Sequence, residues 1–419
     1  MAENRKNPAI RLKGFNDAWE QRKLRELCVL FADGDWIESK DQSDSGVRLV
    51  QTGNVGIAEF LDKPNNQKWI TEETFIKLNC EEVLPGDILI SRLPEPAGRA
   101  CIMPFLGVKV ITAVDCTIAR TASDCSNKFL LQYLSSQNYF NEVNTSLAGG
   151  TRQRISRSNL ACFNIPTPTN FKEQEAIGEY FENLDNLITL HQRKLLKIKN
   201  LKKAMLEKMF PQNGQNKPEI RFNGFADAWE QRKLRDIADR VVRKNTNLES
   251  TLPLTISAIY GLVDQITYFN NRIASLDVSN YYLVKKGEFA YNKSYSDGFP
   301  FGAVKRLERY EQGVLSTLYI VFSPKKDIIN SDYLVSYYDT NNWHKQVSER
   351  AAEGARNHGL LNISAGDFFD TELKFPRDLV EQSQIGQFFQ NLDNLIALHQ
   401  HKLDKLKNIK KACLEKMFI

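Results

Sequence analysis

The chain has 419 residues, of which 42% are hydrophobic, 10% aromatic and 26% charged. A chain of this length is too long for one ordinary core, so we expect two or three packed domains. The formal net charge of +5 is mild for this length, and composition alone therefore does not indicate nucleic-acid binding.

No apolar run approaches the length of a membrane span, and the first ten residues, MAENRKNPAI, lack the apolar segment of a secretory signal. The seven cysteines form no C-x-x-C pair, which favours reduced structural thiols over a zinc site. We expect a cytoplasmic protein without a membrane partner.

The first predicted element is an arm that the chain repeats. IRLKGFNDAWEQRKLREL (10–27) aligns with IRFNGFADAWEQRKLRDI (220–237), and 13 of the 18 positions are identical. A period of 210 residues is too long for a solenoid repeat, so it indicates a duplicated unit of domain size.

A variable region follows each arm, at residues 28–162 and 238–376. Short β-branched and aromatic runs broken by Gly, Pro and Asn predict strands and loops. GDILISR (86–92) resembles GEFAYNK (287–293), which indicates a shared fold. FLLQYLSSQNYF and DYLVSYYDTNNWHKQV each predict one late helix, so we expect two α+β domains.

The two long blocks at 171–210 and 379–418, identical at 27 of 40 positions, predict helices. Asn170 with Glu173, and Asp378 with Glu381, have the spacing of N-terminal caps. Apolar residues alternate at spacings of four and three, the period of a coiled coil. His191, Lys202, His399 and Lys410 are polar exceptions at equivalent places. The predicted coiled-coil and docking positions are Ile177, Phe181, Leu184, Ile188, Leu195, Ile198, Ile385, Phe389, Leu392, Ile396, Leu403 and Leu406.

We expect these helices to pair as an antiparallel coiled coil, because the acidic beginning of one (171–185) would then lie beside the basic end of the other (402–416), although the same bias also suits each helix dipole. A helix of 40 residues is about 60 Å long. The predicted architecture is two α+β domains joined by this coil, with an internal pseudo-two-fold axis. The predicted divisions are residues 1–165, a helix over 166–210, a linker over 211–220, residues 221–376, and a helix over 377–419.

The sequence offers little for catalysis. It contains no glycine-rich phosphate-binding loop, no G-x-S-x-G motif of a serine hydrolase and no H-E-x-x-H motif of a zinc protease. Glu38-Ser39-Lys40 and Glu372-Leu373-Lys374 have the Glu-x-Lys spacing of some nucleases, but neither has a convincing upstream Asp to share a metal ion. A stand-alone DNA-cleaving enzyme and a purely structural protein-binding scaffold remain the alternatives. We expect no catalytic residue, metal or cofactor in this chain.

The duplicated arms with D-A-W-E-x-x-K-L, the strands GDILISR and GEFAYNKS, and the helix openings EQEAIGEYFENLD and EQSQIGQFFQNLD resemble the specificity subunit of Type I restriction–modification systems. The resemblance covers essentially the whole chain. It implies two target recognition domains, each reading half of a bipartite double-stranded DNA site in phage defence.

The same resemblance implies partners. The helices would dock two modification subunits, which carry S-adenosylmethionine and methylate adenine at N6. Restriction subunits would add translocation and cleavage with ATP and Mg²⁺. A complex that serves methylation alone remains an alternative.

Base discrimination in the major groove favours Arg, Lys, Asn and Gln. Each candidate can instead be an ion-paired surface residue, and the segment 149–160 can instead support its domain against the helix. The candidate DNA-binding residues are Arg92, Arg99, Arg152, Arg154 and Arg157 in the first region, and Lys293, Lys305, Arg306, Arg356, Asn357 and His358 in the second.

Overall fold

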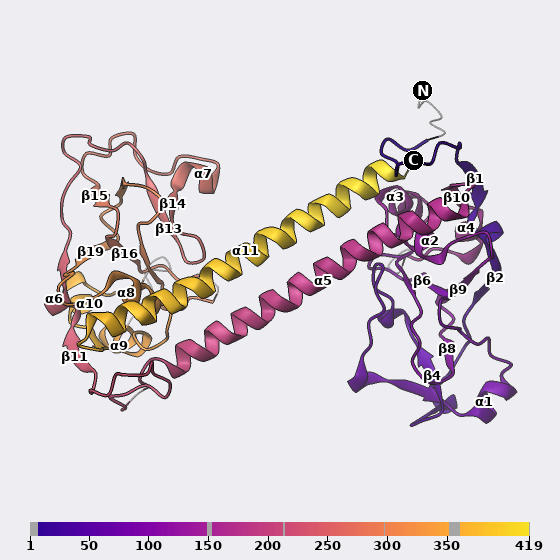
Figure 1. Ribbon diagram of the computed structural model, residues 1–419, viewed down its shortest axis with the longest axis horizontal. Helices are drawn as coiled ribbons and strands as arrows, with labels where there is room; N and C mark the ends of the chain where they lie inside the picture. Colours follow the sequence, from indigo (N-terminus) through magenta and orange to yellow (C-terminus); the bar gives the residue numbers. More distant parts are fainter. Residues whose placement is uncertain (1–6, 149–152, 213, 297, 352–360, 419) are drawn as a thin grey trace. The chain divides into compact units, whose positions relative to one another are not determined.

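The computed structural model describes residues 7–148, 153–212, 214–296, 298–351 and 361–418. The chain divides into two compact units (Figure 1). Unit 1 comprises Met1–Gln192 with His401–Ile419, and unit 2 comprises Arg193–Gln400. The unit boundaries fall inside the two long helices, α5 (Phe171–Lys208) and α11 (Leu379–Met417). Each helix therefore contributes its first part to one unit and its last part to the other.

Unit 1 contains two four-stranded sheets and an antiparallel strand pair. The pair joins β1 (Glu20–Lys23) to β10 (Asn164–Thr167). The first sheet has the order β2 (Cys28–Asp33), β9 (Cys116–Thr121), β6 (Ile88–Ser91), β7 (Ala100–Ile102). The second has the order β3 (Gln42–Ser43), β5 (Lys68–Ile70), β4 (Val47–Val50), β8 (Val110–Thr112).

The short helices of unit 1 lie mostly after its strands. They are α1 (Glu72–Lys77), α2 (Asn127–Tyr133), α3 (Gln137–Thr145) and α4 (Arg157–Cys162). The described part of the unit also contains short 3-10 helices at Leu24–Leu27, Ser39–Asp41, Thr52–Asn54 and Pro64–Asn66.

Unit 2 likewise contains an antiparallel strand pair and a four-stranded sheet. β11 (Glu230–Lys233) pairs with β20 (Glu372–Phe375), and a four-stranded sheet has the order β12 (Ala238–Arg240), β19 (Ile320–Pro324), β16 (Phe289–Asn292), β17 (Ala303–Arg306). Two further strand pairs join β13 (Leu254–Ser257) to β14 (Gly261–Asp264) and β15 (Tyr282–Lys285) to β18 (Gln312–Leu315). Its short helices are α6 (Leu234–Ile237), α7 (Gln265–Phe269), α8 (Ser331–Tyr338), α9 (His344–Arg350) and α10 (Ala365–Phe369).

The central sheets of the two units have the same strand order, and their central strands β6 and β16 pair with their neighbours in the same register. Ile88 lies between Ala119 and Ile102, and Phe289 lies between Phe322 and Arg306. This register confirms that GDILISR and GEFAYNK are equivalent strands. The predicted α+β class with two repeated domains and two long packed helices is confirmed.

Each predicted late helix is two helices. FLLQYLSSQNYF divides into α2 and α3, and DYLVSYYDTNNWHKQV divides into α8 and α9. In unit 1 the break has a local cause: Ser136 is extended, and its hydroxyl accepts a hydrogen bond from the amide of Tyr139 to begin α3. Hydroxyl caps of this kind start a new helix, and the apolar spacing does not reveal them.

A buried carboxylate fastens each arm to its helix. The Arg11 guanidinium donates to both oxygens of Glu173 at 2.6 and 2.7 Å, and Trp19 donates to the same carboxylate at 3.3 Å. In unit 2, Arg221 donates to both oxygens of Glu381 at 2.6 and 2.8 Å. Each Glu side chain is only 1% exposed, and the bidentate arginine compensates the cost of burying its carboxylate.

The predicted caps are half confirmed. Asn170 accepts a hydrogen bond from the Lys172 amide at 3.0 Å, and Asp378 accepts one from Val380 at 2.7 Å. The glutamates three residues on bind the arms instead of the capping residues.

The glutamine after each glutamate joins three chain segments. Gln174 accepts from the Ser126 amide, which precedes α2, and donates to the carbonyls of Asp124 and Pro168. Gln382 makes the equivalent bonds to Asn330, Ile328 and Pro376. The E-Q-x-x-I-G motif is therefore a structural joint between the long helix and its domain.

The glycine of the motif permits close helix packing. A Cβ atom at Gly178 would lie 2.6 Å from the Lys128 Cβ, and one at Gly386 would lie 2.6 Å from the Asp332 Cβ. No side chain fits at either position without displacing α2 or α8.

The end of each long helix completes the core of the unit that it reaches. In unit 1, the Phe418 ring packs in an aromatic cage with centroid distances of 5.7 to 6.4 Å, formed by Trp19, Phe129, Tyr133 and Phe181. In unit 2, Phe210 occupies the equivalent cage at 5.5 to 6.3 Å, formed by Trp229, Tyr333, Tyr337 and Phe389.

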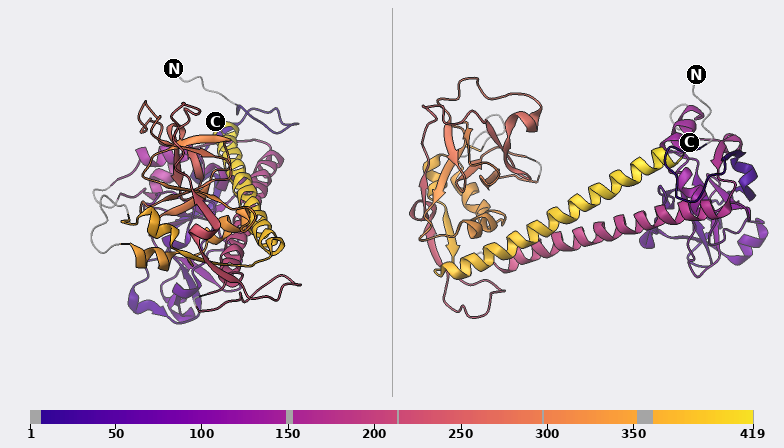
Figure 2. Two further views of the ribbon diagram at one scale, coloured as in Figure 1. Left: turned by 90° about the vertical axis from the view of Figure 1, so that its left-hand side faces the viewer. Right: turned by 45° about the horizontal axis from the view of Figure 1, so that its top comes forward.

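Within each unit the helix segments run antiparallel (Figure 2). In unit 1, Tyr180 contacts Cys413 and Asp185 contacts Lys410; in unit 2, Lys202 contacts Asp393 and Phe210 contacts Phe389. As the residue number rises on one helix it falls on the other, as the charge pattern predicts.

The polar lysines of the seam form cross-helix ion pairs. Lys410 lies 2.6 Å from Asp185 in unit 1. Lys202 lies 2.7 Å from both Asp393 and Asp339 in unit 2. Burial acts to lower the pKa of Lys202, but the attraction of the two carboxylates outweighs it and raises that pKa. Lys202 therefore bridges two carboxylates, of which Asp339 is also paired with Lys305.

We expect Phe418→Ala to lower the free energy of unfolding of unit 1 by about 3–5 kcal/mol, because it removes the ring that fills the cage. Leu196→Ala, at an exposed helix position, is the control and changes stability by less than about 0.5 kcal/mol. Denaturant unfolding measures both. Equal, small effects would show that the helix end is not part of the core.

We expect Lys202→Met to destabilise more than the equivalent Lys410→Met. The first removes the ammonium that Asp339 shares with Lys305 and also removes the partner of Asp393, so it breaks two charged hydrogen bonds and costs about 1.5–3 kcal/mol. The second leaves Asp185, whose side chain is 34% exposed, and costs about 1 kcal/mol. Urea midpoints of the matched pair measure the difference, and a larger destabilisation by Lys410→Met would contradict this account.

Candidate functional site

Three of the predicted basic residues meet in unit 1 around two carboxylates. Arg92 and Arg157 lie 3.5 and 3.6 Å from Asp33, while Arg92 and Arg154 each lie 3.8 Å from Asp115. Arg92 directly follows β6, Asp33 ends β2, and Arg154 and Arg157 precede or begin α4. We name these three arginines and two aspartates the arginine cluster.

The members of the cluster differ in exposure. The Arg92 side chain is buried, and it donates to the Val114 carbonyl at 2.6 Å. The side chains of Arg154 and Arg157 are 62% and 46% exposed. Their carboxylate distances exceed hydrogen-bond length. Their guanidinium groups are therefore oriented by charge while their donors face solvent, a state suited to binding an anionic or hydrogen-bond-accepting partner.

Arg99 lies apart from the cluster and holds a loop together. Its guanidinium donates to four backbone carbonyls at 2.7 to 3.0 Å, those of Val55, Leu93, Pro96 and Thr52. Burial lowers the pKa of Arg99. Four carbonyl acceptors use most of the five donors of an arginine, so its main role is structural.

Lys293 in unit 2 occupies the place that Arg92 has in unit 1. The Arg92 carbonyl accepts from the Ile155 amide at 3.2 Å, and the Lys293 carbonyl accepts from the Leu361 amide at 3.0 Å. The Lys293 ammonium also donates to the Ile363 carbonyl at 3.3 Å. Both residues thus anchor the segment that runs into the strand pair at the arm.

Lys305 and Arg306 point from β17 towards α8. Lys305 lies 3.1 Å from Asp339. Arg306 lies 2.7 Å from Asp332, the Ser331 hydroxyl and Glu308, and its side chain is 13% exposed. Contact of either residue with DNA would require these ion pairs to open. Their role in DNA binding stays a prediction, as it does for the arginines of unit 1.

Four candidates, Arg152, Arg356, Asn357 and His358, lie outside the described residues. Sequence reasoning also missed Asp33 and Asp115, which orient the arginine cluster. No local motif reveals them, because the arginines that they pair with come from other elements of the fold, well separated from them along the chain.

Unit 2 has an exposed apolar surface that the sequence reasoning did not identify. It follows the turn between β13 and β14 and continues through α7 and beyond, where Ile259, Tyr260, Ile273 and Leu276 are 58 to 86% exposed. The sequence pattern, alternating residues of a strand followed by a helix, does not indicate that these side chains face solvent.

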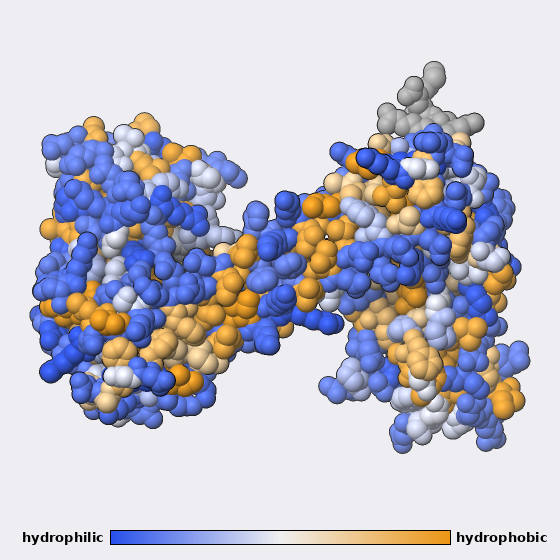
Figure 3. Space-filling view, viewed as in Figure 1, coloured by the Kyte–Doolittle hydropathy of each residue, from blue (hydrophilic) through white to orange (hydrophobic). Residues whose placement is uncertain are grey.

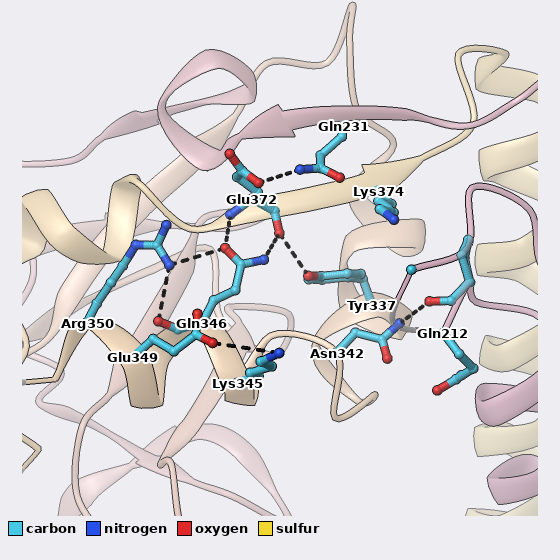
Figure 4. Close-up of a pocket in the computed structure, with 12 residues that line it drawn as sticks. Gln212, Gln231, Tyr337, Asn342, Lys345, Gln346, Glu349, Arg350, Glu372 and Lys374 are labelled. Carbon is cyan, nitrogen blue, oxygen red and sulfur yellow. Dashed lines mark hydrogen bonds and ion pairs between the residues drawn. The ribbon is translucent and has the colours of Figure 1, made fainter.

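The two Glu-x-Lys triplets do not form a metal centre. Glu372 lines a pocket of about 320 Å³, where its carboxylate accepts from Gln231 and its backbone bonds to Gln346 (Figure 4). Lys374 donates to Gln215 and Asn216. Glu38 pairs with Lys40 at the surface. Among the described residues, no group of three His, Cys, Asp or Glu side chains could hold a metal ion.

The predicted coiled-coil positions are buried or half-buried, and those at the start of each helix pack in the core of their domain. Ile177, Phe181, Leu184, Leu195, Ile385, Phe389, Leu392 and Leu403 are buried, and Ile188, Ile198, Ile396 and Leu406 are half-buried. A docking partner would therefore contact other positions. Exposed leucines lie on the outer faces, at Leu187 and Leu190 in unit 1 and at Leu196, Leu201, Leu395 and Leu398 in unit 2, and apolar surface is visible along the helices (Figure 3).

No helix in the described part of the chain is long and apolar enough to cross a membrane.

Comparison with known proteins gives a consistent result. A family model described as "Type I restriction modification DNA specificity domain" matches residues 16–200 and again residues 226–408. Among solved structures, the chain is similar to the S subunit of a Type-I restriction-modification system from M. genitalium, with 14% sequence identity, a TM-score of 0.64 and coverage of 99% of both chains.

A second solved chain comes from a structure described as "Structural basis underlying complex assembly and conformational transition of the type I R-M system". It is 13% identical, with a TM-score of 0.51, and the similarity covers 97% of this chain and 99% of that one. At these identities the structural similarity supports the fold, while the family match spans both repeats.

We expect Arg99→Ala to destabilise unit 1 by about 1–3 kcal/mol, because it leaves the part-buried carbonyls of Val55, Leu93 and Thr52 without this donor. Arg154→Ala, the exposed member of the cluster, is the matched control and shifts stability by less than about 0.5 kcal/mol. Thermal and urea unfolding of both variants measure this. Equal stability of the two would contradict the structural role of Arg99.

Proposed function

Because the chain belongs to the Type I restriction-modification DNA specificity family, we propose that it reads a bipartite, asymmetric site in double-stranded DNA, one half with each of its two DNA recognition domains. The proposal rests on one observation: the two units share the strand order of the central sheet, the arm joint and the aromatic cage, yet differ in the basic residues placed around that sheet.

The arginine cluster supports base or phosphate recognition by unit 1. Arg154 and Arg157 combine exposure with orientation by Asp33 and Asp115, and arginine can donate two hydrogen bonds to guanine in the major groove. Since Lys293, Lys305 and Arg306 of unit 2 bond to groups of their own domain, its half-site would be read by a different set of side chains. Different readers in similar frames produce an asymmetric site.

The helices supply surfaces for partner subunits. The leucines on their outer faces are exposed in each unit, although leucine normally lies in a core. We infer that two modification subunits dock on these faces and that restriction subunits join the complex. In this scheme S-adenosylmethionine belongs to the modification subunits, ATP and Mg²⁺ belong to the restriction subunits, and this chain supplies no catalytic group in the cytoplasmic complex.

Footprinting of the chain with two modification subunits tests the proposal. We expect two short protected segments separated by unprotected base pairs. Arg154→Ala with Arg157→Ala should weaken binding about 10- to 100-fold for each arginine that binds a base, and should alter protection in one segment only. The segment protected by unit 2 is the internal control. A single continuous footprint, or binding without sequence preference, would contradict a bipartite reader.

A further inference from the structure

Unit 1 contains a pocket of about 470 Å³ that the DNA-reading role does not use. It lies where α2 and β7 meet the first part of α5, beside the loop at residues 57–59. Ile102, Leu131 and Ile188 form an apolar part of its lining. Acidic and amide side chains form much of the rest, so the pocket is suited to an occupant with an apolar stem and a polar end.

Gln132 lines this pocket, and its buried side-chain oxygen lacks a hydrogen-bond partner among the described residues. Gln132 is 3% exposed and lies in α2, and its side-chain oxygen is buried and accepts no hydrogen bond within the described part of the chain. A buried acceptor without a donor is costly, and native proteins satisfy nearly all such atoms. An occupant that donates an N–H to this oxygen would remove the cost.

The charges around the pocket favour a cation. Its lining includes three carboxylates, Glu59, Glu182 and Asp185, and one ammonium, Lys128. Lys128 lies 2.7 Å from Glu182, and Asp185 pairs with Lys410 at 2.6 Å. No ion pair engages Glu59 among the described residues, and Glu59 is exposed at the rim. The lining is net negative.

Unit 2 fills the equivalent place with its own arginine. In the shared sheet register Ile102 corresponds to Arg306, because each pairs with the equivalent residue of the central strand, Ile88 or Phe289. The Arg306 guanidinium contacts Ser331 and Asp332 of α8, each at 2.7 Å.

The helix residues correspond as well. The alignment of NKFLLQYL with SDYLVSYY places Ser331 and Asp332 at the positions of Asn127 and Lys128, which line the pocket of unit 1. It places Ser336 at the position of Gln132, and the Ser336 hydroxyl donates to the Asp332 carbonyl. In unit 2, Arg306 and Ser336 therefore bond to groups of their own domain, whereas in unit 1 the Gln132 oxygen has no hydrogen-bond partner among the described residues.

We propose that the pocket of unit 1 receives an arginine or lysine side chain from a modification subunit. Its donor binds the Gln132 oxygen, Glu59 balances its charge, and its aliphatic stem packs on Ile102, Leu131 and Ile188. The inference rests on the proposed docking of modification subunits. It adds that the two docking positions are unequal, because the equivalent place in unit 2 is filled by Arg306.

A variant that plugs the pocket tests this. Ile102→Arg with Lys128→Asp gives unit 1 the arginine–aspartate pair that unit 2 has at the equivalent positions. Ile76→Arg with Lys77→Asp makes the same two changes at exposed positions of α1 and is the matched control. Gln132→Leu removes the acceptor while keeping a similar volume. Titration calorimetry with the separately purified modification subunit measures affinity and stoichiometry, and circular dichroism checks folding.

For the plugged variant, we expect binding of one modification subunit to weaken at least about tenfold while the other still binds. Gln132→Leu should weaken the same binding step, and the control should bind two copies as the unmodified chain does. Unchanged binding by folded plugged and Gln132→Leu variants would overturn the pocket while leaving docking intact. Failure of the unmodified chain to bind the modification subunit would overturn the proposed docking and the pocket together.

Discussion

The structure depends on a buried carboxylate paired with an arginine from a distant part of the sequence. Glu173 and Glu381 are almost fully buried, and each is neutralised by a bidentate guanidinium 162 or 160 positions away along the chain. A buried carboxylate without its partner is strongly destabilising, so the arm and the helix fold together or not at all. The adjoining Gln and Gly of the same motif then fix the position of α2 or α8. One short stretch of helix thus joins arm, domain and long helix.

This joint explains why the repeated parts of the sequence are so similar and the rest is free to differ. The arms, the helix openings and the Met-Phe helix ends all take part in buried contacts that occur once in each unit. The groups that differ, such as the arginine cluster of unit 1 and the paired Lys305 and Arg306 of unit 2, lie on the frame that these contacts hold. A DNA specificity protein needs this separation, because its recognition surfaces must change without altering the frame that carries them.

The sequence predicts the parts whose cause is local. Apolar residues at spacings of four and three identify the seam positions of both long helices, and the polar exceptions Lys202 and Lys410 are largely buried in that seam. The spacing does not identify the residues with which these two lysines pair. Asp393 and Asp185 become partners of these lysines only once the helices pair. Glu173 and Glu381 have the spacing of capping groups in the sequence, because their arginine partners lie far away along the chain. The break between α2 and α3 depends on one serine hydroxyl, which an apolar pattern cannot show.

The candidate site shows the same limit. Residue type selects arginine and lysine as DNA-reading side chains, but the direction of a side chain depends on its tertiary neighbours. Arg99 binds backbone carbonyls and Arg306 binds acidic groups of its own domain, whereas Arg154 and Arg157 face solvent. All four have the same signal in the sequence, and only the fold separates them.

The most direct test of whether each domain reads its own half-site is the exchange of one recognition region. Residues 28–162 are replaced by the corresponding region of another member of the family, with the arms and long helices unchanged, and the DNA sequence bound with modification subunits is determined by selection. We expect one half-site to change to that of the donor while the other half-site is retained. A site that is unchanged in both halves, or altered in both, would contradict this expectation.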